Sequence, residues 1–173
     1  MATERIEPLI SAAEIDARVD ELAREINDRY EGREIAVVGV LTGAVFFLVD
    51  LVRRLDSASR VTFFTARSYR AGRSAGPLEV EAEDPGILRG RDVLVVDDVL
   101  DTGATLGRVL DMAAGAGPAS LASCVLLVKD RQRVRAIEPD FVGFRIDDVY
   151  VVGYGLDLAG RHRTLPYVGK VVD

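Results

Sequence analysis

Hydrophobic residues are distributed along the chain in two alternating patterns: short continuous runs, and longer segments with helical spacing. The continuous runs are rich in valine, isoleucine and leucine and lie at Ile35–Val40, Val93–Val96 and Leu121–Val128. Such runs are typical of strands that are buried on both faces of a parallel sheet. Shorter candidate strands are Val61–Thr65, Phe141–Phe144, Tyr150–Tyr154 and Tyr167–Val171.

Three segments with helical spacing are interleaved with these runs. The first begins with a capping-box pattern at Ser11 and Glu14, and its apolar residues recur until Gly32. The second spans Val45–Leu55 and the third Leu106–Ala113. Strands that alternate with helices predict an α/β fold with a mostly parallel sheet covered on both faces. Ligands of such folds bind at the carboxyl ends of the strands.

The stretch from Ala66 to Arg91 differs from the rest of the chain because it is rich in glycine, proline and charged residues. Within it, Leu78, Val80 and Ala82 alternate with glutamates, which predicts a short exposed ribbon. A loop of this length inside a compact domain is usually functional, often as a lid. We therefore expect a lid here.

Length, charge and rare residues narrow the class of protein. With 173 residues the chain is expected to form one domain, since domains usually have about 100–200 residues. Its net charge of −6 argues against nucleic acid or an anionic membrane as a partner. One cysteine, Cys124, and one histidine, His162, exclude an internal disulfide and metal sites built from several such residues. No signal peptide or membrane-spanning run is visible, so we expect a cytoplasmic protein.

The segment Val95–Thr105, with the sequence VVDDVLDTGAT, has the most specific chemical pattern. It places Asp97 and Asp98 after an apolar strand, where two neighbouring carboxylates repel each other and need a cation or hydroxyl donors. Residues from Asp101 onward open the next helix, whose free N–H groups and dipole favour an anion. A diol or metal site beside a phosphate cradle predicts a site for a ribose 5-phosphate.

This segment resembles the motif with which type I phosphoribosyltransferases bind 5-phosphoribosyl 1-pyrophosphate (PRPP). Three further segments resemble the purine-binding end of hypoxanthine and hypoxanthine-guanine phosphoribosyltransferases: Leu126–Asp130 (LLVKD), Pro139–Phe144 (PDFVGF) and Tyr150–Asp157 (YVVGYGLD). The resemblance covers nearly the whole chain, about residues 5–173. It implies the type I phosphoribosyltransferase fold, with a central mostly parallel sheet flanked by helices, a small hood lobe and a mobile lid loop.

The resemblance also implies how one domain over residues 1–173 is divided. The core would run from about 33 to 150 and the lid from about 66 to 90, while the hood would combine the N-terminal segment with about 150–173.

The implied function is purine salvage, in which the phosphoribosyl group of PRPP is transferred to a 6-oxopurine base. Hypoxanthine or guanine would give IMP or GMP plus pyrophosphate, with Mg²⁺ as cofactor and a homodimer or homotetramer as the assembly. No nucleic-acid or membrane partner is implied. Two alternatives stay open: a PRPP-sensing regulatory protein on the same fold, and a xanthine or pyrimidine phosphoribosyltransferase. The presence of Asp101, Lys129 and Asp157 favours the enzyme.

On the PRPP side, the resemblance makes Asp101 the catalytic acid/base near N7 of the purine. Asp97 and Asp98 would hold the ribose hydroxyls and Mg²⁺-bound water. The cradle for the 5-phosphate would comprise Asp101, Thr102, Gly103, Ala104 and Thr105. Ala104 stands where a lysine or arginine is common in the family.

On the purine side, Lys129 would bond the 6-oxo group, Tyr150 would stack on the base, and Val151 would offer backbone groups to the base edge. Asp157 would lie at the purine end and bind a second Mg²⁺, and Arg163 would contact pyrophosphate. The pyrophosphate loop would be Leu41, Thr42 and Gly43, with threonine where the family commonly has lysine after a peptide bond that can be cis. Ser68 and Tyr69 would begin the lid.

Several residues with reactive or charged side chains are expected to have no direct part in the chemistry. Arg131, Arg133 and Arg135 are expected to form a solvated face, and His162 to be exposed and non-catalytic. Cys124 lies within an apolar strand and is expected to be inert core.

Overall fold

A six-stranded sheet forms the centre of the molecule in the computed structural model, which describes residues 5–56, 59–71 and 74–172. Its strands follow the order β4-β3-β2-β5-β6-β7. They are β2 (Ile35–Leu41), β3 (Ser59–Ala71), β4 (Ser74–Ala82), β5 (Asp92–Leu100), β6 (Ser120–Asp130) and β7 (Phe141–Asp147). All neighbours are parallel except β3 and β4, so the predicted mostly parallel α/β sheet is confirmed.

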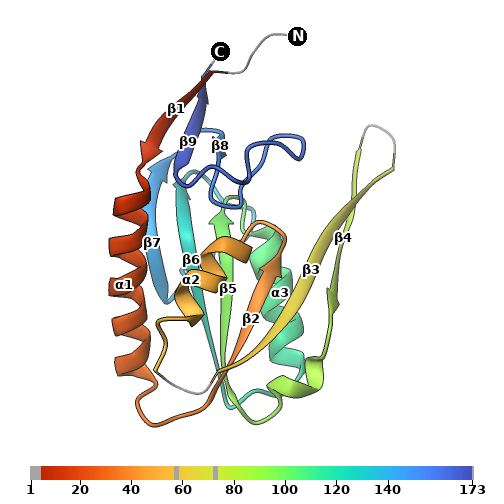
Figure 1. Ribbon diagram of the computed structural model, residues 1–173. Coiled ribbons are helices and arrows are strands. Elements are labelled where there is room, and N and C mark those ends of the chain that lie inside the picture. The colour runs from red at the N-terminus through yellow and green to blue at the C-terminus, as the bar shows by residue number, and fades with distance from the viewer. Residues whose placement is uncertain (1–4, 57–58, 72–73, 173) are drawn as a thin grey trace.

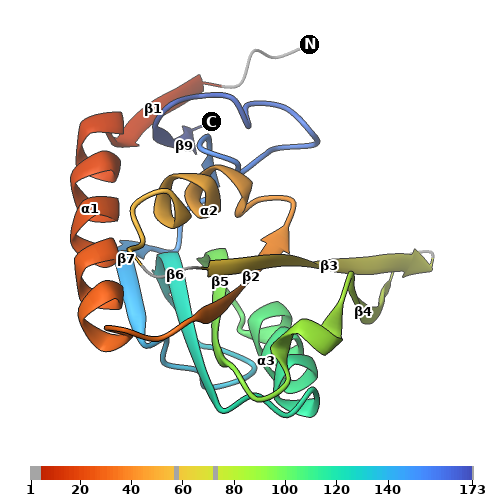
Figure 2. The same ribbon diagram turned by 60° about the horizontal axis from the view of Figure 1, so that its bottom comes forward.

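Three helices cover the two faces of this sheet. They are α1 (Ala12–Arg29), α2 (Val45–Val52) and α3 (Ala104–Gly115). Figure 2 shows α1 and α2 on one face and α3 on the other. The predicted capping box is present at the start of α1, where the Ser11 hydroxyl accepts from the Glu14 amide and the Glu14 carboxylate accepts from the Ser11 amide.

The core is divided by the sheet into two apolar clusters. Successive residues of each strand point to opposite faces, so Val37 packs with α1 and α2 whereas Val38 packs with α3. In β5, Leu94 and Val95 are divided in the same way, and all four side chains are fully buried. Burial on both faces explains why the strands read as continuous hydrophobic runs rather than as alternating patterns.

A second, three-stranded sheet combines the two ends of the described chain. Its order is β1-β9-β8, with β1 at Arg5–Ile10, β9 at Val168–Val172 and β8 at Val151–Val152. Figure 1 shows this small sheet at the carboxyl end of the central strands. Strand β1 was not predicted from the sequence, and β8 is shorter than the predicted strand Tyr150–Tyr154.

The glycine-rich stretch from Ala66 to Arg91 is largely regular structure, which corrects the expectation of a long irregular loop. Strands β3 and β4 form an antiparallel hairpin that extends past the central sheet (Figure 1), and a short 3₁₀ helix, η1 (Pro85–Leu88), follows it. The predicted ribbon is confirmed within β4, where Val80 is buried between the exposed Glu79 and Glu81. No helix in the described part of the chain is long and apolar enough to cross a membrane.

Candidate active site

A cleft of about 450 Å³ lies where the central strands end beneath the small sheet. Among the residues that line it are most of those selected from the sequence: Leu41, Thr42, Gly43, Asp97, Asp98, Asp101, Thr102, Gly103, Thr105, Lys129, Tyr150, Val151, Asp157 and Arg163. Ala104 is exposed on α3 and does not belong to the described wall of the cleft. The side chains of Ser68 and Tyr69 lie outside the described residues.

Asp97 and Asp98 lie within strand β5 rather than after it, because the strand continues to Leu100. The Asp98 amide donates to the Asp97 carboxylate at 3.0 Å, and the Val99 amide donates to the Asp98 carboxylate at 2.9 Å. Burial, followed by repulsion from Asp98, raises the pKa of Asp97 well above its ordinary value, and burial also raises the pKa of Asp98. Ionising both carboxylates therefore calls for a cation or hydroxyl donors in the cleft.

The turn after β2 brings backbone directly against this acidic pair. The peptide bond between Leu41 and Thr42 is cis. A Cβ built on Gly43 would lie 1.7 Å from Oδ2 of Asp98, and one built on Gly155 would lie 2.0 Å from the Gly43 carbonyl oxygen. Glycine at both positions thus allows the turn to fit between β5 and the segment that follows β8.

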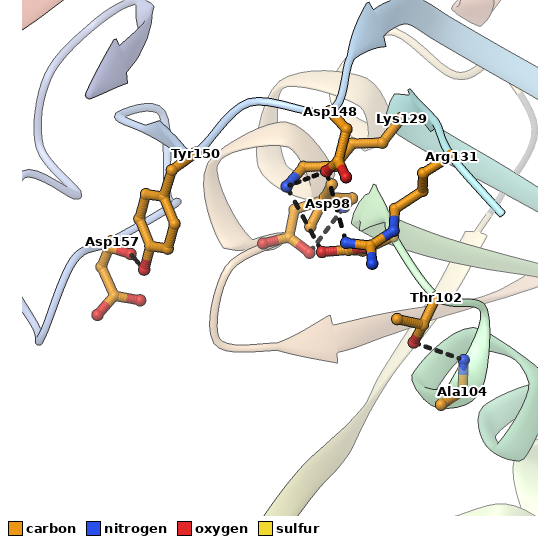
Figure 3. Close-up of polar contacts among 10 residues, drawn as sticks. Asp98, Thr102, Ala104, Lys129, Arg131, Asp148, Tyr150 and Asp157 are labelled. Carbon is orange, nitrogen blue, oxygen red and sulfur yellow. Dashed lines mark hydrogen bonds and ion pairs between the residues drawn. The ribbon is translucent and has the colours of Figure 1, made fainter. Parts of the chain in front are cut away.

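The start of α3 offers unpaired backbone donors to the cleft. Its N-cap is Gly103, in the left-handed conformation with φ of 82°, and no side chain caps the helix there. The Val134 and Arg135 amides donate to the Thr102 carbonyl at 2.9 and 3.3 Å, which holds this turn from behind. Free N–H groups at a helix start favour a bound anion such as phosphate. The Ala104 amide faces the Thr102 hydroxyl at 3.4 Å (Figure 3), a long contact that an anion could replace.

Lys129, at the end of β6, belongs to an ion-pair network of four residues. Its Nζ lies 3.5 Å from Asp101 and 3.8 Å from Asp148, although the residue is only 8% exposed. Arg131 lies 2.6 Å from Asp101 and 3.4 Å from Asp148. Figure 3 shows the side chains of Lys129, Arg131 and Asp148 converging on one point.

The expected solvated face of three arginines is confirmed in part: Arg131 and Arg135 are exposed but also form ion pairs, and Arg133 is half-buried. Arg131 joins the network around Asp101. Arg133 is half-buried and donates to the Ile137 carbonyl, and Arg135 forms two hydrogen bonds with Asp111 while its chain covers the start of α3. The segment after β6 folds back over α3, and this long-range contact leaves no local pattern.

Tyr150, Asp157 and Arg163 form the side of the cleft beneath the small sheet. Tyr150 is 52% exposed, and its hydroxyl donates to the Asp157 carbonyl at 3.1 Å (Figure 3). Arg163 forms an ion pair with the Asp157 carboxylate at 2.6 Å and donates to the Gly155 carbonyl at 2.6 Å. An exposed ring at the rim of a cleft is available for stacking on a planar ligand.

The remaining expectations concern Cys124 and His162. Cys124 is fully buried in β6, as predicted, and burial raises the pKa of its thiol. His162 is half-buried rather than exposed, and it does not belong to the described wall of the cleft.

Among the charged residues near the cleft, Arg131 and Asp148 were not selected from the sequence as site residues. Neither residue has a usable local signal. Strand β6 ends at Asp130 and the Arg131 amide donates to the Lys129 carbonyl at 3.1 Å, so the alternation of a strand does not extend to Arg131. The distance of Asp148 from Lys129 depends on how β7 pairs with β6.

An acidic pair, the uncapped start of α3 and an exposed tyrosine ring surround one cleft in this fold, an arrangement that suits a phosphoribosyltransferase. A family model for the phosphoribosyl transferase domain matches residues 11–159. The chain therefore belongs to this family and is an enzyme of the phosphoribosyl-transferring class.

Its relatives place it more narrowly. It is 44% identical to the hypoxanthine phosphoribosyltransferase of Salmonella typhimurium and 42% identical to that of Escherichia coli, with 96% of each chain covered in both cases. Among solved structures, a hypoxanthine-guanine phosphoribosyltransferase from Bacillus anthracis matches with a TM-score of 0.88 at 34% identity, covering 99% of this chain and 100% of that one. The sequence resemblance to this group and the predicted fold are confirmed.

Proposed function

We propose that this enzyme transfers the phosphoribosyl group of PRPP to a 6-oxopurine base, hypoxanthine and also guanine, and releases pyrophosphate. The reaction salvages free purine bases as IMP or GMP. The observation that carries the proposal is the position of Lys129. This donor-only side chain is nearly buried in the same cleft as the acidic pair and the phosphate cradle, so it can recognise a carbonyl oxygen on the base.

On the PRPP side, the 5-phosphate would bind the N–H groups between Asp101 and Thr105, supported by the uncapped start of α3. The ribose hydroxyls would donate to Asp97 and Asp98. This contact would offset the cost of ionising two buried carboxylates whose pKa values are raised.

Pyrophosphate would leave toward the Leu41–Gly43 turn and Arg163. The described residues contain no group of three or more side chains able to hold a metal ion by themselves. Mg²⁺ nevertheless fits, because it keeps several waters and is usually held by one or two carboxylates together with substrate phosphates. Asp157 would bind it directly, and Asp97 and Asp98 through water. When bound, Mg²⁺ would neutralise charge on the pyrophosphate leaving group.

On the base side, Tyr150 would stack on the purine and Lys129 would donate to its 6-oxo oxygen. The backbone of Val151 in β8 would bond the base edge. The carboxylate of Asp101 would hold the proton at N7 and accept it as the purine nitrogen forms its bond to C1 of the ribose. A positioned acid or base of this kind contributes about 10²–10⁴-fold to a rate.

We also propose a division of labour within the single domain of residues 1–173. The core, about 33–150, would hold PRPP, and a hood, made of β1 and about 150–173, would hold the base. The β3–β4 hairpin, within about 66–90, would act as a lid that excludes water, and Ser68 and Tyr69 would begin it. The extension of this hairpin past the sheet on the cleft side supports that role (Figure 1). The assembly would be a homodimer or homotetramer in the cytoplasm.

The decisive experiment measures pyrophosphate release with PRPP, Mg²⁺ and each free base in turn. We expect turnover with hypoxanthine and guanine, and little with adenine or uracil. Asp101→Asn serves as the matched control, because it keeps the shape of the side chain and removes the carboxylate that would accept the proton. Wild-type enzyme that uses no 6-oxopurine would overturn the proposed function. An Asp101→Asn variant with full turnover at saturating substrates would overturn the role of Asp101 as general base.

A further inference from the structure

The contacts of Asp101 are divided between two basic residues, with one carboxylate oxygen for each. A guanidinium nitrogen of Arg131 lies 2.6 Å from Oδ1, whereas the ammonium of Lys129 lies 3.5 Å from Oδ2. Asp148 contacts both basic groups, at 3.4 Å from Arg131 and 3.8 Å from Lys129. Oδ1 of Asp101 is therefore in close ionic contact with Arg131, without hydrogen-bond geometry, and Oδ2 is only in long contact with Lys129.

The two basic residues also differ in their relation to the cleft. Lys129 lines it, whereas Arg131 does not belong to the part of its wall that the structure describes. The Asp101 side chain is 39% exposed, yet its Oδ1 atom is covered from solvent. A substrate in the cleft can therefore reach Asp101 only through Oδ2.

We propose that Arg131 is a positioning residue for the catalytic carboxylate, and that it fixes Oδ1 so that Oδ2 faces the purine ring nitrogen. The inference rests on the proposed function, because it assigns Oδ2 the proton at N7. When the base binds, the loose contact from Lys129 is exchanged for the 6-oxo oxygen, while the short contact from Arg131 is kept. Asp148 contacts the same guanidinium nitrogen of Arg131 as Asp101 does, at 3.4 Å, and helps to hold it in place.

The proposal predicts a separation between turnover and PRPP binding. Arg131→Gln removes the charged contact, so the carboxylate rotates away from its working orientation, and kcat should fall about tenfold, since misplacing a reacting group by 1 Å can cost about 10²-fold. The KM for PRPP should change less than twofold, because Arg131 lies outside the phosphate cradle. Arg131→Lys keeps a positive charge without the planar fork and should restore part of kcat.

Arg145→Gln is the control for loss of an exposed arginine, since Arg145 forms a surface ion pair with Glu138. It should retain wild-type kinetics. Thermal unfolding of each variant identifies any general loss of structure.

A double variant shows whether Arg131 acts through Asp101. In an Asp101→Asn background no base is left to position, so adding Arg131→Gln should lower kcat less than twofold further. An unchanged kcat in the single variant, the same tenfold loss in both backgrounds, or a loss expressed as a higher KM for PRPP would overturn the inference. Wild-type enzyme that fails to use hypoxanthine overturns the proposed function itself. Active wild type with an unaffected Arg131→Gln variant overturns only the role of Arg131.

Discussion

Gly43 and Asp98 approach each other so closely that a side chain on the glycine has no room. A Cβ at Gly43 would lie 1.7 Å from Oδ2 and 2.7 Å from Cγ of Asp98. The turn assigned to pyrophosphate and the carboxylate assigned to the ribose are thus in direct van der Waals contact, and a change in one displaces the other.

Gly43→Ala should therefore impair the enzyme far more than the same substitution at an uncrowded glycine would. The added Cβ must move the Asp98 carboxylate or the turn, and both are assigned to PRPP, so kcat/KM for PRPP should fall about 10²-fold. Steady-state kinetics measures this loss. Gly115→Ala is the control, because a Cβ there meets no atom within 4 Å. Equal activity of the two variants would contradict the role of the turn.

Gly103→Ala tests the phosphate cradle. The position has φ of 82°, and a Cβ there would lie 2.5 Å from the Arg135 carbonyl oxygen, so the turn must open. PRPP affinity, measured by calorimetry, should fall at least about tenfold, because one or two charge-assisted bonds to the phosphate are lost.

The matched control for this change is Gly90→Ala. Gly90 also has a positive φ, of 68°, but a Cβ there meets no atom within 4 Å. Both variants should lose about 1–2 kcal/mol of stability from the left-handed backbone. Gly103→Ala should lose more because of its clash with Arg135, and only Gly103→Ala should lose PRPP affinity. Unchanged PRPP affinity in Gly103→Ala would show that the phosphate binds elsewhere.

Lys129→Gln tests selection of the base. The ammonium group is a donor only, so facing the 6-amino group of adenine it leaves a nearly buried charge unpaired, at a cost of about 1–3 kcal/mol or more. The glutamine amide can donate or accept. The variant should therefore lose hypoxanthine efficiency and narrow the gap to adenine, measured as the ratio of kcat/KM values. If the variant keeps both the wild-type rate with hypoxanthine and the wild-type discrimination against adenine, Lys129 does not select the base. Specificity would then be assigned to the backbone near Val151.

Asp97→Asn should stabilise the ligand-free protein while it abolishes activity. Folding raises the pKa of Asp97 through burial and through repulsion from Asp98. The free energy of unfolding is therefore least reduced by Asp97 below the pKa of an unfolded aspartate, about 3.9, where the side chain is protonated in both states. As the pH rises through the pKa in the folded state, Asp97 ionises and that stability is lost.

The asparagine stays neutral, so it avoids this loss. At pH 7 the variant should be more stable by about 0.5–2 kcal/mol, and the difference should shrink toward pH 4. Thermal unfolding at several pH values measures it. A variant that is less stable at pH 7 would show that the ionised Asp97 is already compensated in the free enzyme.

The central sheet was predicted well from the sequence, because a strand buried on both faces is a continuous hydrophobic run that can be seen within a few residues, as in Ile35–Val40. It missed β1, since Arg5–Ile10 contains charged residues and a proline and depends on pairing with a strand far away in the chain. It also ended the strand at Val96, because Asp97 and Asp98 were taken as its boundary. Those carboxylates extend the strand into the cleft instead.

Residues that line the cleft were predicted where they belong to one contiguous motif, as at Asp101–Gly103, or where the family resemblance pointed to them, as at Lys129 and Tyr150. The contact between Arg131 and Asp101 was not predicted, because it depends on how the segment after β6 folds back. Arg131 is exposed, as predicted, and what the sequence missed is its ion pairs with Asp101 and Asp148. Tertiary folding decides which charged groups come into contact, whereas hydrophobic periodicity indicates only which positions along the chain are buried.

The pairing of β1 with β9 affects how the enzyme is made on the ribosome. Arg5–Ile10 is synthesised early, and in the described structure its strand partner is Val168–Val172, which is synthesised after every strand of the central sheet. The central strands, from β2 to β7, are complete before that partner exists. Because domains fold as synthesis proceeds, a nascent chain can assemble the central sheet first, and the wall of the cleft that depends on β8 pairing with β9 is completed only after β9 has been synthesised.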